Sequence, residues 1–472
     1  MNFFKSHKIE IFIFLLAVFV RIVFPLICFF QNGGSIENTL HGQDGYFEIS
    51  RNLLLGNGFS INSSIPFAPY SYGVPGYPFF LFFLLALTGS YLGTGMIQLL
   101  LGATIPLIGM RLTRFILPSS KHIPIIVAVF LALSPYQILF SFVFSTEILF
   151  SVLFGIFLIF FFNFLKSFST RNAVWVGMFL GLATLVKATT QYLFLVVIIF
   201  LLWHFGWKIN KNIVSKLGYF FLAFLLVLLP WLYRNYMTFS EINLSSQLPV
   251  NLYLTLLPSV LAIQNNSSFA EEQKKLVKIN PLNLEDQNSL TLSKTLAGKA
   301  VAEILEHPAA LIKLYIINTI TFFTHDGMLT FLQAAGIKPV AYLEKPAIVL
   351  FAESPKEFVM MMGDYLKTSM ALVFFARLFW IILTAFFLLG LYNIWRSKNF
   401  SREFIFSIII ILYFMLTTLV IGLAVNARFR MPVEPIIFAV SIAGMSIYCG
   451  RLKEKFTQIK KHRINSEPSC SI

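Results

Sequence analysis

Charged residues are scarce in this sequence. Asp, Glu, Lys and Arg make up 12% of the 472 residues, whereas hydrophobic residues make up 57%, above the roughly 45–50% of soluble domains. The mean hydropathy is +0.78, and phenylalanine alone supplies 54 residues. The remaining residues are too few to cover a soluble protein of this length with a polar surface. The composition therefore excludes a soluble domain and predicts a polytopic membrane protein.

Cysteine and acidic residues are also few. The three cysteines, Cys28, Cys449 and Cys470, show no metal-ligand spacing, so we expect neither a disulfide framework nor a zinc site. The 21 acidic residues are outnumbered by 36 Lys and Arg, a balance that can indicate nucleic-acid binding. Here the bases lie in short runs beside apolar segments, which membrane topology explains better. We expect membrane lipids and no nucleic acid as partners.

Apolar runs long enough to cross a hydrocarbon core of about 30 Å occur about ten times. The first follows Lys5, His7 and Lys8 and is too long for a signal-peptide core, so we expect a retained helix. Two further stretches, 75–92 and 308–323, are expected to lie along the outer membrane face. The predicted fold class is an all-α integral membrane protein, a polytopic helical bundle. The predicted spans are 9–30, 95–117, 123–143, 147–165, 173–190, 191–207, 217–236, 370–393, 404–425 and 432–449.

Basic residues mark one face of this bundle. They follow alternate spans and lie near both termini, so the positive-inside rule places these segments in the cytoplasm. The opposite, outer face then holds most of the acids, in 31–94, 237–369 and two tight turns. We expect a cytoplasmic or inner membrane protein in three parts: an N-terminal membrane half (1–236), an outer cap region with a juxtamembrane or re-entrant helix (237–369), and C-terminal helices with a basic tail (370–472).

The first outer loop holds the strongest candidate for chemistry. Asp44 lies there at the membrane face, where an ionisable group is costly and points to function. A carboxylate in this place suits a general base that takes a proton from an acceptor hydroxyl or amine. The alternative is that Asp44 caps the helix that begins near Gly45. Tyr46, Glu48 and Tyr77, close by in the sequence, are candidate substrate contacts.

Glu147 lies where the third predicted span turns into the fourth. A lone acid between two very apolar helices is costly unless it is paired or hydrated. It stabilises the first turn of the fourth span through the helix dipole, or it joins Asp44 in binding a divalent metal or the acceptor. The residue pattern leaves both readings open.

Four cations lie on the outer face, where the positive-inside rule does not favour them: Lys187, Arg234, Arg428 and Arg430. They either snorkel to the lipid headgroups or bind a lipid phosphate, arginine through its planar fork and lysine as a point charge. Arg21 and Arg377 lie within predicted spans and are assigned to pairing inside the bundle.

Taken in order, these residues resemble the polyprenyl-phosphate-sugar-dependent glycosyltransferases of the GT-C superfamily. The similarity is to the bacterial branch that includes protein-O-mannosyltransferase-like and lipid A aminoarabinose transferase enzymes, and it covers residues 10 to about 445. The matching segments are Asp44-Gly-Tyr46 with Arg51-Asn-Leu-Leu-Leu-Gly56-Asn-Gly58, Pro75-Gly-Tyr-Pro-Phe-Phe-Leu, Ser145-Thr-Glu147, Gly181-Leu-Ala-Thr-Leu-Val-Lys187, Pro230-Trp-Leu-Tyr-Arg234-Asn-Tyr and Arg428-Phe-Arg430-Met-Pro432-Val-Glu434-Pro435.

The resemblance implies a GT-C-type fold with about ten transmembrane helices, two juxtamembrane helices in the first outer loop and an active site facing the periplasm or exterior. It makes Asp44 the expected catalytic acid–base residue and places Glu147 at the family's second acidic position. Many relatives carry another acid directly after the first aspartate, where this chain has Gly45. No cofactor is assigned, and a divalent metal stays an open alternative.

The predicted function is transfer of a sugar from a polyprenyl-phosphate donor to a lipid, glycan or protein acceptor. Asp44 would deprotonate the acceptor, while Lys187, Arg234, Arg428 and Arg430 would hold the departing phosphate. A transporter or lipid flippase would instead place its acids or broken helices at the bilayer midplane. An O-antigen polymerase or ligase would gather its arginines in one large outer loop. The sequence names neither the sugar nor the acceptor.

Overall fold

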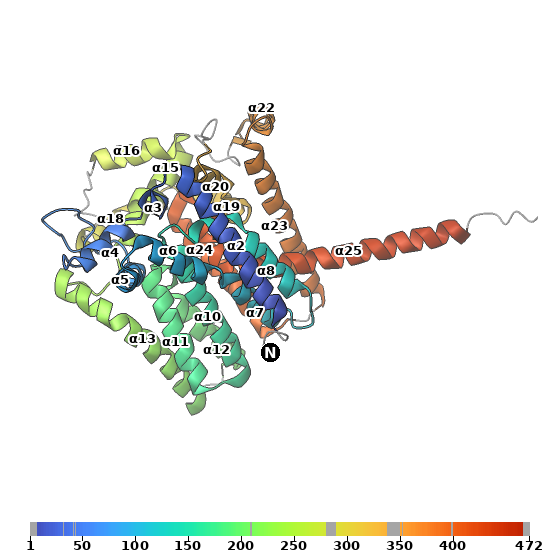
Figure 1. Cartoon of the computed structure of the whole chain (residues 1–472), viewed down its shortest axis with the longest axis horizontal. Helices are drawn as coiled ribbons and strands as arrows, with labels where there is room; N and C mark the ends of the chain where they lie inside the picture. Colours follow the sequence, from blue (N-terminus) through green and yellow to red (C-terminus); the bar gives the residue numbers. More distant parts are fainter. Residues whose placement is uncertain are drawn as a thin grey trace, which may run out of the picture.

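The computed structural model describes residues 7–31, 33–40, 42, 44–207, 210–279, 289–337, 350–351, 353–397 and 400–465, without the side chains of Asn38, Tyr365 and 450–465. Figure 1 shows helices packed into one body, from which the C-terminal part of α25 projects. The described residues form helices and no strand. The predicted all-α class is therefore confirmed.

Seven described helical stretches are long and apolar enough to cross a membrane. Five shorter apolar helices accompany them. Each predicted span coincides with one of these stretches, and the two predicted juxtamembrane segments coincide with α5 and α19. The long stretches are α2 (Lys8–Gln31), α6 (Tyr91–Gly102) with α7 (Ile105–Ile116), α10 (Thr146–Ser167), α13 (Lys211–Phe239), α23 (Ala371–Ser397), α24 (Arg402–Thr418) with η3 (Leu419–Ala424), and η5 (Met431–Val433) with α25 (Glu434–Asn465). The shorter ones are α5 (Gly76–Thr88), α8 (Ile123–Leu133), α11 (Thr170–Val186), η1 (Ala188–Thr190) with α12 (Leu193–His204), and α19 (Pro308–Thr324).

One predicted span, 123–143, is broken in the structure. It divides into α8 and the short helix α9 (Pro135–Phe140), and Ser134 between them has an extended backbone with ψ 119°. The cause is Pro135, which lacks an N–H group and disfavours helical geometry in the residue before it. The chain then turns through 141–145 and begins α10, so that Glu147 lies in the first turn of that helix.

The burial of the long helices separates the centre of the bundle from its edge. In the most apolar window of α23 only 17% of residues are buried, and in that of α13 22%, against 72% for Met431–Cys449. Apolar side chains exposed over whole helix faces are stable only in an apolar solvent. We conclude that the chain is a multi-pass membrane protein, with α13 and α23 facing lipid and the start of α25 at the centre.

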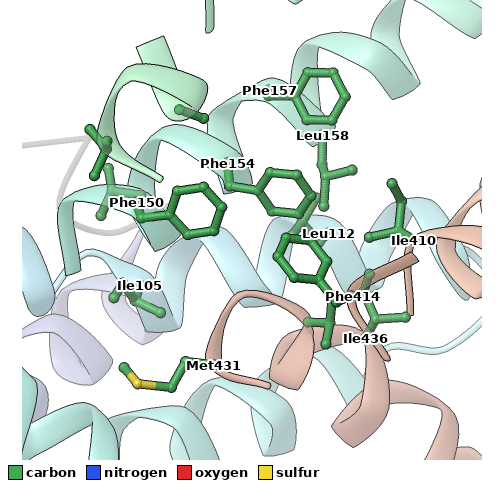
Figure 2. Close-up of a cluster of buried hydrophobic side chains, with 14 of the residues drawn as sticks. Ile105, Leu112, Phe150, Phe154, Phe157, Leu158, Ile410, Phe414, Met431 and Ile436 are labelled. Carbon is green, nitrogen blue, oxygen red and sulfur yellow. The ribbon is translucent and has the colours of Figure 1, made fainter. Parts of the chain in front are cut away.

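The core of the bundle lies around α10 and is largely aromatic. Figure 2 shows Phe150, Phe154 and Phe157 of α10 beside residues of α7, α24 and α25. The rings of Phe154 and Phe414 meet edge to face at a centroid distance of 5.1 Å, a favoured geometry for aromatic pairs. This packing fixes α10, and with it Glu147, against the last two spans.

Basic residues from different loops meet at one end of the bundle, here called the basic end. Arg114 pairs with Glu10 at 3.0 Å, and Lys216 donates to Thr170 Oγ1 at 2.6 Å. Arg402 Nη1 lies 2.9 Å from His204 Nε2. Each contact joins two of the segments that the topology prediction places in the cytoplasm, and Lys5, Lys208 and Lys398 lie outside the described residues.

The opposite end of the bundle, here called the site end, carries short helices and a helical layer with its own apolar core. In this layer Tyr253, Leu257 and Leu314 are buried. The layer contacts the last spans just after Gly422, where the backbone N–H of the next residue, Leu423, donates to Ser259 Oγ at 2.9 Å. The elements of this end are α3 (Ile36–Leu40), α4 (Tyr46–Leu54), α14 (Gln247–Asn251), the π-helical turn η2 (Leu252–Leu256), α15 (Leu257–Asn265), α16 (Phe269–Ile279), α18 (Leu290–Leu305), α20 (Met328–Ala334), α22 (Pro355–Leu366) and η4 (Ala427–Phe429).

Candidate active site

The loop before α4 places Asp44 without using it as a helix cap. The N-cap of α4 is Gly45 and not Asp44, and Gly45 has a left-handed backbone (φ 71°, ψ 8°). A Cβ atom at Gly45 would lie 2.3 Å from Ile61 Cδ1, so this position needs glycine for both conformation and space. The capping alternative for Asp44 is therefore wrong, and its carboxylate is directed elsewhere.

Asparagine side chains hold the rest of this loop together. Asn52 donates to the carbonyls of Ser60 and Asn62, both at 2.8 Å, and accepts from Asn57 at 3.2 Å. A backbone bond from Phe144 N to Leu40 O, 2.8 Å long, ties the loop to the turn before α10. These bonds bring the segments that carry Asp44 and Glu147 together.

Asp44 faces Arg428. Its Oδ2 lies 3.5 Å from Arg428 Nη1, and 36% of the Asp44 side chain is exposed. Burial raises the pKa of the Asp44 carboxyl above its usual range, and Glu147 adds to this, while Arg428 and Lys187 oppose it. A partly exposed carboxylate with a raised pKa is a better proton acceptor than an ordinary one.

Glu147 is buried and paired. Its side chain is 1% exposed, its Oε1 accepts a hydrogen bond from Lys187 Nζ at 2.8 Å, and Arg428 Nε lies 4.0 Å from the same oxygen. Since Glu147 is in the first turn of α10, the helix dipole also favours its charge. Asp44, Glu147, Lys187 and Arg428 thus form one group of alternating charge, which we call the charge cluster.

Lys187 reaches Glu147 from the end of α11, where it is the C-cap residue. Helix α5 is pressed against this end, because a Cβ atom at Gly76 would lie 2.7 Å from the carbonyl carbon of Leu185. A cation at a helix C-terminus is favoured by the dipole. About a fifth (19%) of the Lys187 side chain is exposed, so the ammonium is paired but still has surface available to a ligand.

Arg428 lies in the short turn η4, and two side chains fix that turn. Asn426 Oδ1 accepts from Arg428 N at 3.1 Å, and His325 Nδ1 accepts from Ala427 N at 3.3 Å. Burial opposes the charge of Arg428, but Glu147 and Asp44 outweigh it and raise its pKa. The guanidinium therefore stays protonated between two carboxylates.

The predicted contacts Tyr46, Glu48 and Tyr77 fall into two groups. Tyr77 is fully buried, donates to Gln98 Oε1 at 2.6 Å and supports Tyr46, whose ring meets it edge to face at 5.2 Å. Tyr46 and Glu48 are half-buried on α4. Burial and the nearby Asp44 raise the pKa of Tyr46, which keeps its hydroxyl protonated. We therefore revise Tyr77 from a substrate contact to a support for Tyr46.

The other two predicted phosphate ligands, Arg234 and Arg430, make no described side-chain contact with the four residues of the charge cluster. Arg234 donates to the Tyr70 carbonyl at 3.0 Å, and its guanidinium lies over the ring of Trp231. Arg430 is fully buried, donates to the carbonyls of Phe322 and His325, both at 2.6 Å, and pairs with Glu434 at 3.6 Å. Arg430 is thus enclosed by the protein, and we revise its role to structural support.

The mid-span arginines pair inside the bundle, as predicted. Arg21 Nε donates to Ser141 Oγ at 3.0 Å, and its Nη1 donates to the Ala132 carbonyl at 3.0 Å. Arg377 pairs with Asp326 at 2.6 Å. Neither takes part in the charge cluster.

Sequence reasoning did not assign three tyrosines that surround the charge cluster. Tyr72 donates to Asn251 Oδ1 at 3.3 Å, and Asp44 contributes to raising the pKa of both Tyr70 and Tyr72, after burial. Arg428 and Glu147 also lie close enough to Tyr136 of α9 to act on it electrostatically, after burial and a hydrogen bond to Thr330. The sequence shows Tyr70 and Tyr72 beside the loop, but only the packing of α9 and α14 reveals their place.

Among the described residues, no three His, Cys, Asp or Glu side chains come together as a metal site would require. His41 and Gln43, which flank the loop glycine Gly42, lie outside those residues.

Solved structures share this fold. The apo oligosaccharyltransferase of Archaeoglobus fulgidus matches all of this chain with a TM-score of 0.53 at 16% sequence identity. The chain spans about half the length of that enzyme, 54%. A structure of AglB from the same organism with an inhibitory peptide and a dolichol-phosphate matches 99% of this chain and 53% of its own at 14% identity, with a TM-score of 0.49.

The aminoarabinose transferase ArnT of Cupriavidus metallidurans in the apo state aligns over 90% of this chain and 76% of its own, at 12% identity and a TM-score of 0.32. No family model and no curated protein sequence matches this chain. The predicted polytopic helical membrane fold is thereby confirmed by its likeness to the fold of the archaeal oligosaccharyltransferase.

Proposed function

We propose that this chain is a membrane glycosyltransferase that takes a sugar from a polyprenyl-phosphate donor and transfers it to a lipid, glycan or protein acceptor. The observation that carries the proposal is the charge cluster, in which Arg428 lies 3.5 Å from Asp44 and Lys187 2.8 Å from Glu147. It combines one partly exposed carboxylate with two cations at the site end of a GT-C-type fold. The site end faces the periplasm or the exterior of a cytoplasmic membrane, because the basic loops gather at the other end.

The proposed reaction divides the work between the acid and the cations. The acceptor hydroxyl or amine loses its proton to Asp44 and forms a bond to the anomeric carbon of the sugar. The bond from that carbon to the phosphate oxygen breaks, and the phosphate keeps the electron pair. Arg428 and Lys187 offset the charge that develops on this leaving group, which is often the largest contribution to catalysis.

The structure disfavours the rival reading as a transporter or flippase. Such proteins place ionisable groups or broken helices at the membrane midplane. Asp44, Glu147 and Lys187 instead lie in a loop or at helix ends, and the buried mid-helix Arg21 is occupied by Ser141 and backbone carbonyls. An O-antigen polymerase or ligase would draw its cations from one large loop, whereas Lys187 and Arg428 come from separate turns.

Asp44→Asn tests the proposal. The substitution is nearly isosteric, and Asp44 caps no helix in the structure, so we expect a normal melting temperature. Loss of a general base should reduce turnover by about 10²–10⁴-fold. The assay is transfer by the detergent-purified protein from a panel of polyprenyl-phosphate sugars, with acceptors identified by mass spectrometry of surface glycolipids and glycans from a deletion strain.

Glu48→Gln is the matched control, one helical turn along α4. Near-normal turnover in Asp44→Asn together with a collapse in Glu48→Gln would move the catalytic role to Glu48. Near-normal turnover in both variants would remove this loop from the chemistry, and absence of transfer from every donor in the panel would refute the proposed function.

A further inference from the structure

The charge cluster is electrically balanced by the protein itself. Two carboxylates, Asp44 and Glu147, lie against two cations, Lys187 and Arg428. Both cations lie beside the same oxygen of Glu147, Oε1. The distance to it is 2.8 Å from Lys187 Nζ and 4.0 Å from Arg428 Nε. At neutral pH the formal charges cancel. A divalent ion placed here would add two positive charges to a site that has no surplus of negative charge.

The four residues of the charge cluster do not fit a divalent metal. Mg²⁺ and Ca²⁺ need several oxygen ligands at about 2.0–2.6 Å, and the Glu147 oxygen that would supply one already holds the Lys187 ammonium. Its other oxygen, Oε2, lies 3.4 Å from Thr146 Oγ1. No third metal-ligating side chain of the described residues joins the two acids.

The backbone also disfavours a further acid directly after Asp44. Position 45 is occupied by glycine with φ 71°, and its missing Cβ would lie 2.3 Å from Ile61 Cδ1. An aspartate there would meet both the steric contact and the cost of a left-handed backbone. An acid directly after Asp44 would therefore require the Ile61 side chain to move and would hold a left-handed backbone.

We propose that this site works with the Lys187 ammonium and the Arg428 guanidinium in the place that a divalent metal would take, and that Glu147 is a positioning residue for both cations. The proposal rests on the proposed glycosyltransferase function. Glu147 is 1% exposed, whereas Lys187 and Arg428 are 19% and 34% exposed. The acid is thus closed to ligands, while each cation it holds keeps surface for a phosphate oxygen.

The first test measures metal binding without any substrate. Wild type and Glu147→Gln are stripped with EDTA and titrated with Mn²⁺, and bound metal is followed by electron paramagnetic resonance. We expect both proteins to bind Mn²⁺ only weakly, without saturation over the titration. Saturable Mn²⁺ binding by wild type that Glu147→Gln abolishes would overturn the proposal, and this result does not depend on whether the protein transfers sugar.

The second test measures turnover. EDTA-treated wild type should retain its rate within about twofold, with or without added Mg²⁺ or Mn²⁺. If EDTA treatment abolished turnover and added Mg²⁺ or Mn²⁺ restored it, the proposal would be overturned. A protein that transfers no sugar under any condition would refute the proposed function instead, and the Mn²⁺ titration would still decide the metal question.

The positioning role is tested by a double-mutant cycle. Glu147→Gln and Lys187→Met should each raise the KM for the donor by about tenfold, the effect of losing one hydrogen bond to a charged group. The double variant should raise the KM by clearly less than the product of the two single effects, since Glu147 acts partly through Lys187. Fully additive effects would show that Glu147 does not act through Lys187, and would overturn its assignment.

Discussion

Arg428 and Arg430 are separated by one residue and have opposite surroundings. Arg428 is partly exposed and lies between Asp44 and Glu147. Arg430 has no exposed surface, and its guanidinium lies 3.5 Å from the centroid of the Trp380 ring. The difference follows from the two consecutive short turns, η4 and η5, which direct alternate side chains to the site and to the core. Arg428 therefore keeps surface that a ligand can reach, whereas Arg430 is enclosed in the core.

Arg428→Gln should shift the acid limb of the pH–rate profile to higher pH. Arg428 lowers the pKa of Asp44 against burial, which raises it, so its removal raises that pKa further. A general base acts only when deprotonated, and activity is lost as pH falls through its pKa. The rise of activity should therefore occur at a higher pH than in wild type.

The measurement is donor turnover at saturating substrate over the pH range in which the purified protein stays folded. Arg114→Gln is the control, because Arg114 pairs with Glu10 at the basic end and should leave the profile in place. An unshifted or lowered acid limb in Arg428→Gln would assign that limb to a group other than Asp44.

At the scale of elements, Arg430 holds three helical segments together. It bonds to carbonyls at the end of α19, pairs with Glu434 in α25 and stacks on Trp380 of α23. Arg430→Met should lower stability by about 3–5 kcal/mol, because it leaves a buried carboxylate without its ionic partner. The readout is the melting temperature and the monodisperse yield in detergent.

Arg428→Met is the matched variant for this experiment. It should fold with nearly the wild-type melting temperature and lose donor turnover. If Arg430→Met were as stable as wild type and bound the donor less tightly, Arg430 would return to the phosphate-binding role that the sequence predicts.

The helices were predictable from the sequence because long apolar runs carry a strong signal. The predicted spans coincide with helices, and the exception at 123–143 comes from Pro135, whose effect on residue 134 is local. Asp44, Glu147, Lys187 and Arg428 were also predictable as candidates, since charges at the ends of apolar helices are costly. Their catalytic and binding roles stay predictions until the variants are measured.

The pairing among these residues was not predictable. Arg234, Arg428 and Arg430 look alike in sequence as cations on the outer face, and nothing local shows that Arg430 is enclosed by α19 and α23. The position of Tyr136 near the charge cluster was not predictable for the same reason, because α9 reaches the cluster only through long-range packing. Such contacts join residues that are 40 positions apart, as in Lys187–Glu147, or several times more, and one sequence alone does not record them.

At the scale of the whole molecule, the topology prediction can be tested by cysteine labelling. In a variant without native cysteines, new cysteines at Ser63 and Ala270, both exposed at the site end, should react with an impermeant maleimide in intact cells. Ser119→Cys, exposed between α7 and α8 at the basic end, should react only after permeabilisation. The reverse pattern would invert the topology and place the charge cluster in the cytoplasm.

The charge cluster joins residues 44, 147, 187 and 428 of a chain of 472. On the ribosome, Glu147 and Lys187 are made early and can pair as soon as α10 and α11 are inserted. Arg428 follows α24 in the chain, so the Asp44 carboxylate has no arginine beside it until that helix has been made. Any nascent or truncated chain that ends before residue 428 therefore has the acid that would accept the proton in the proposed reaction and lacks the arginine that lies beside it.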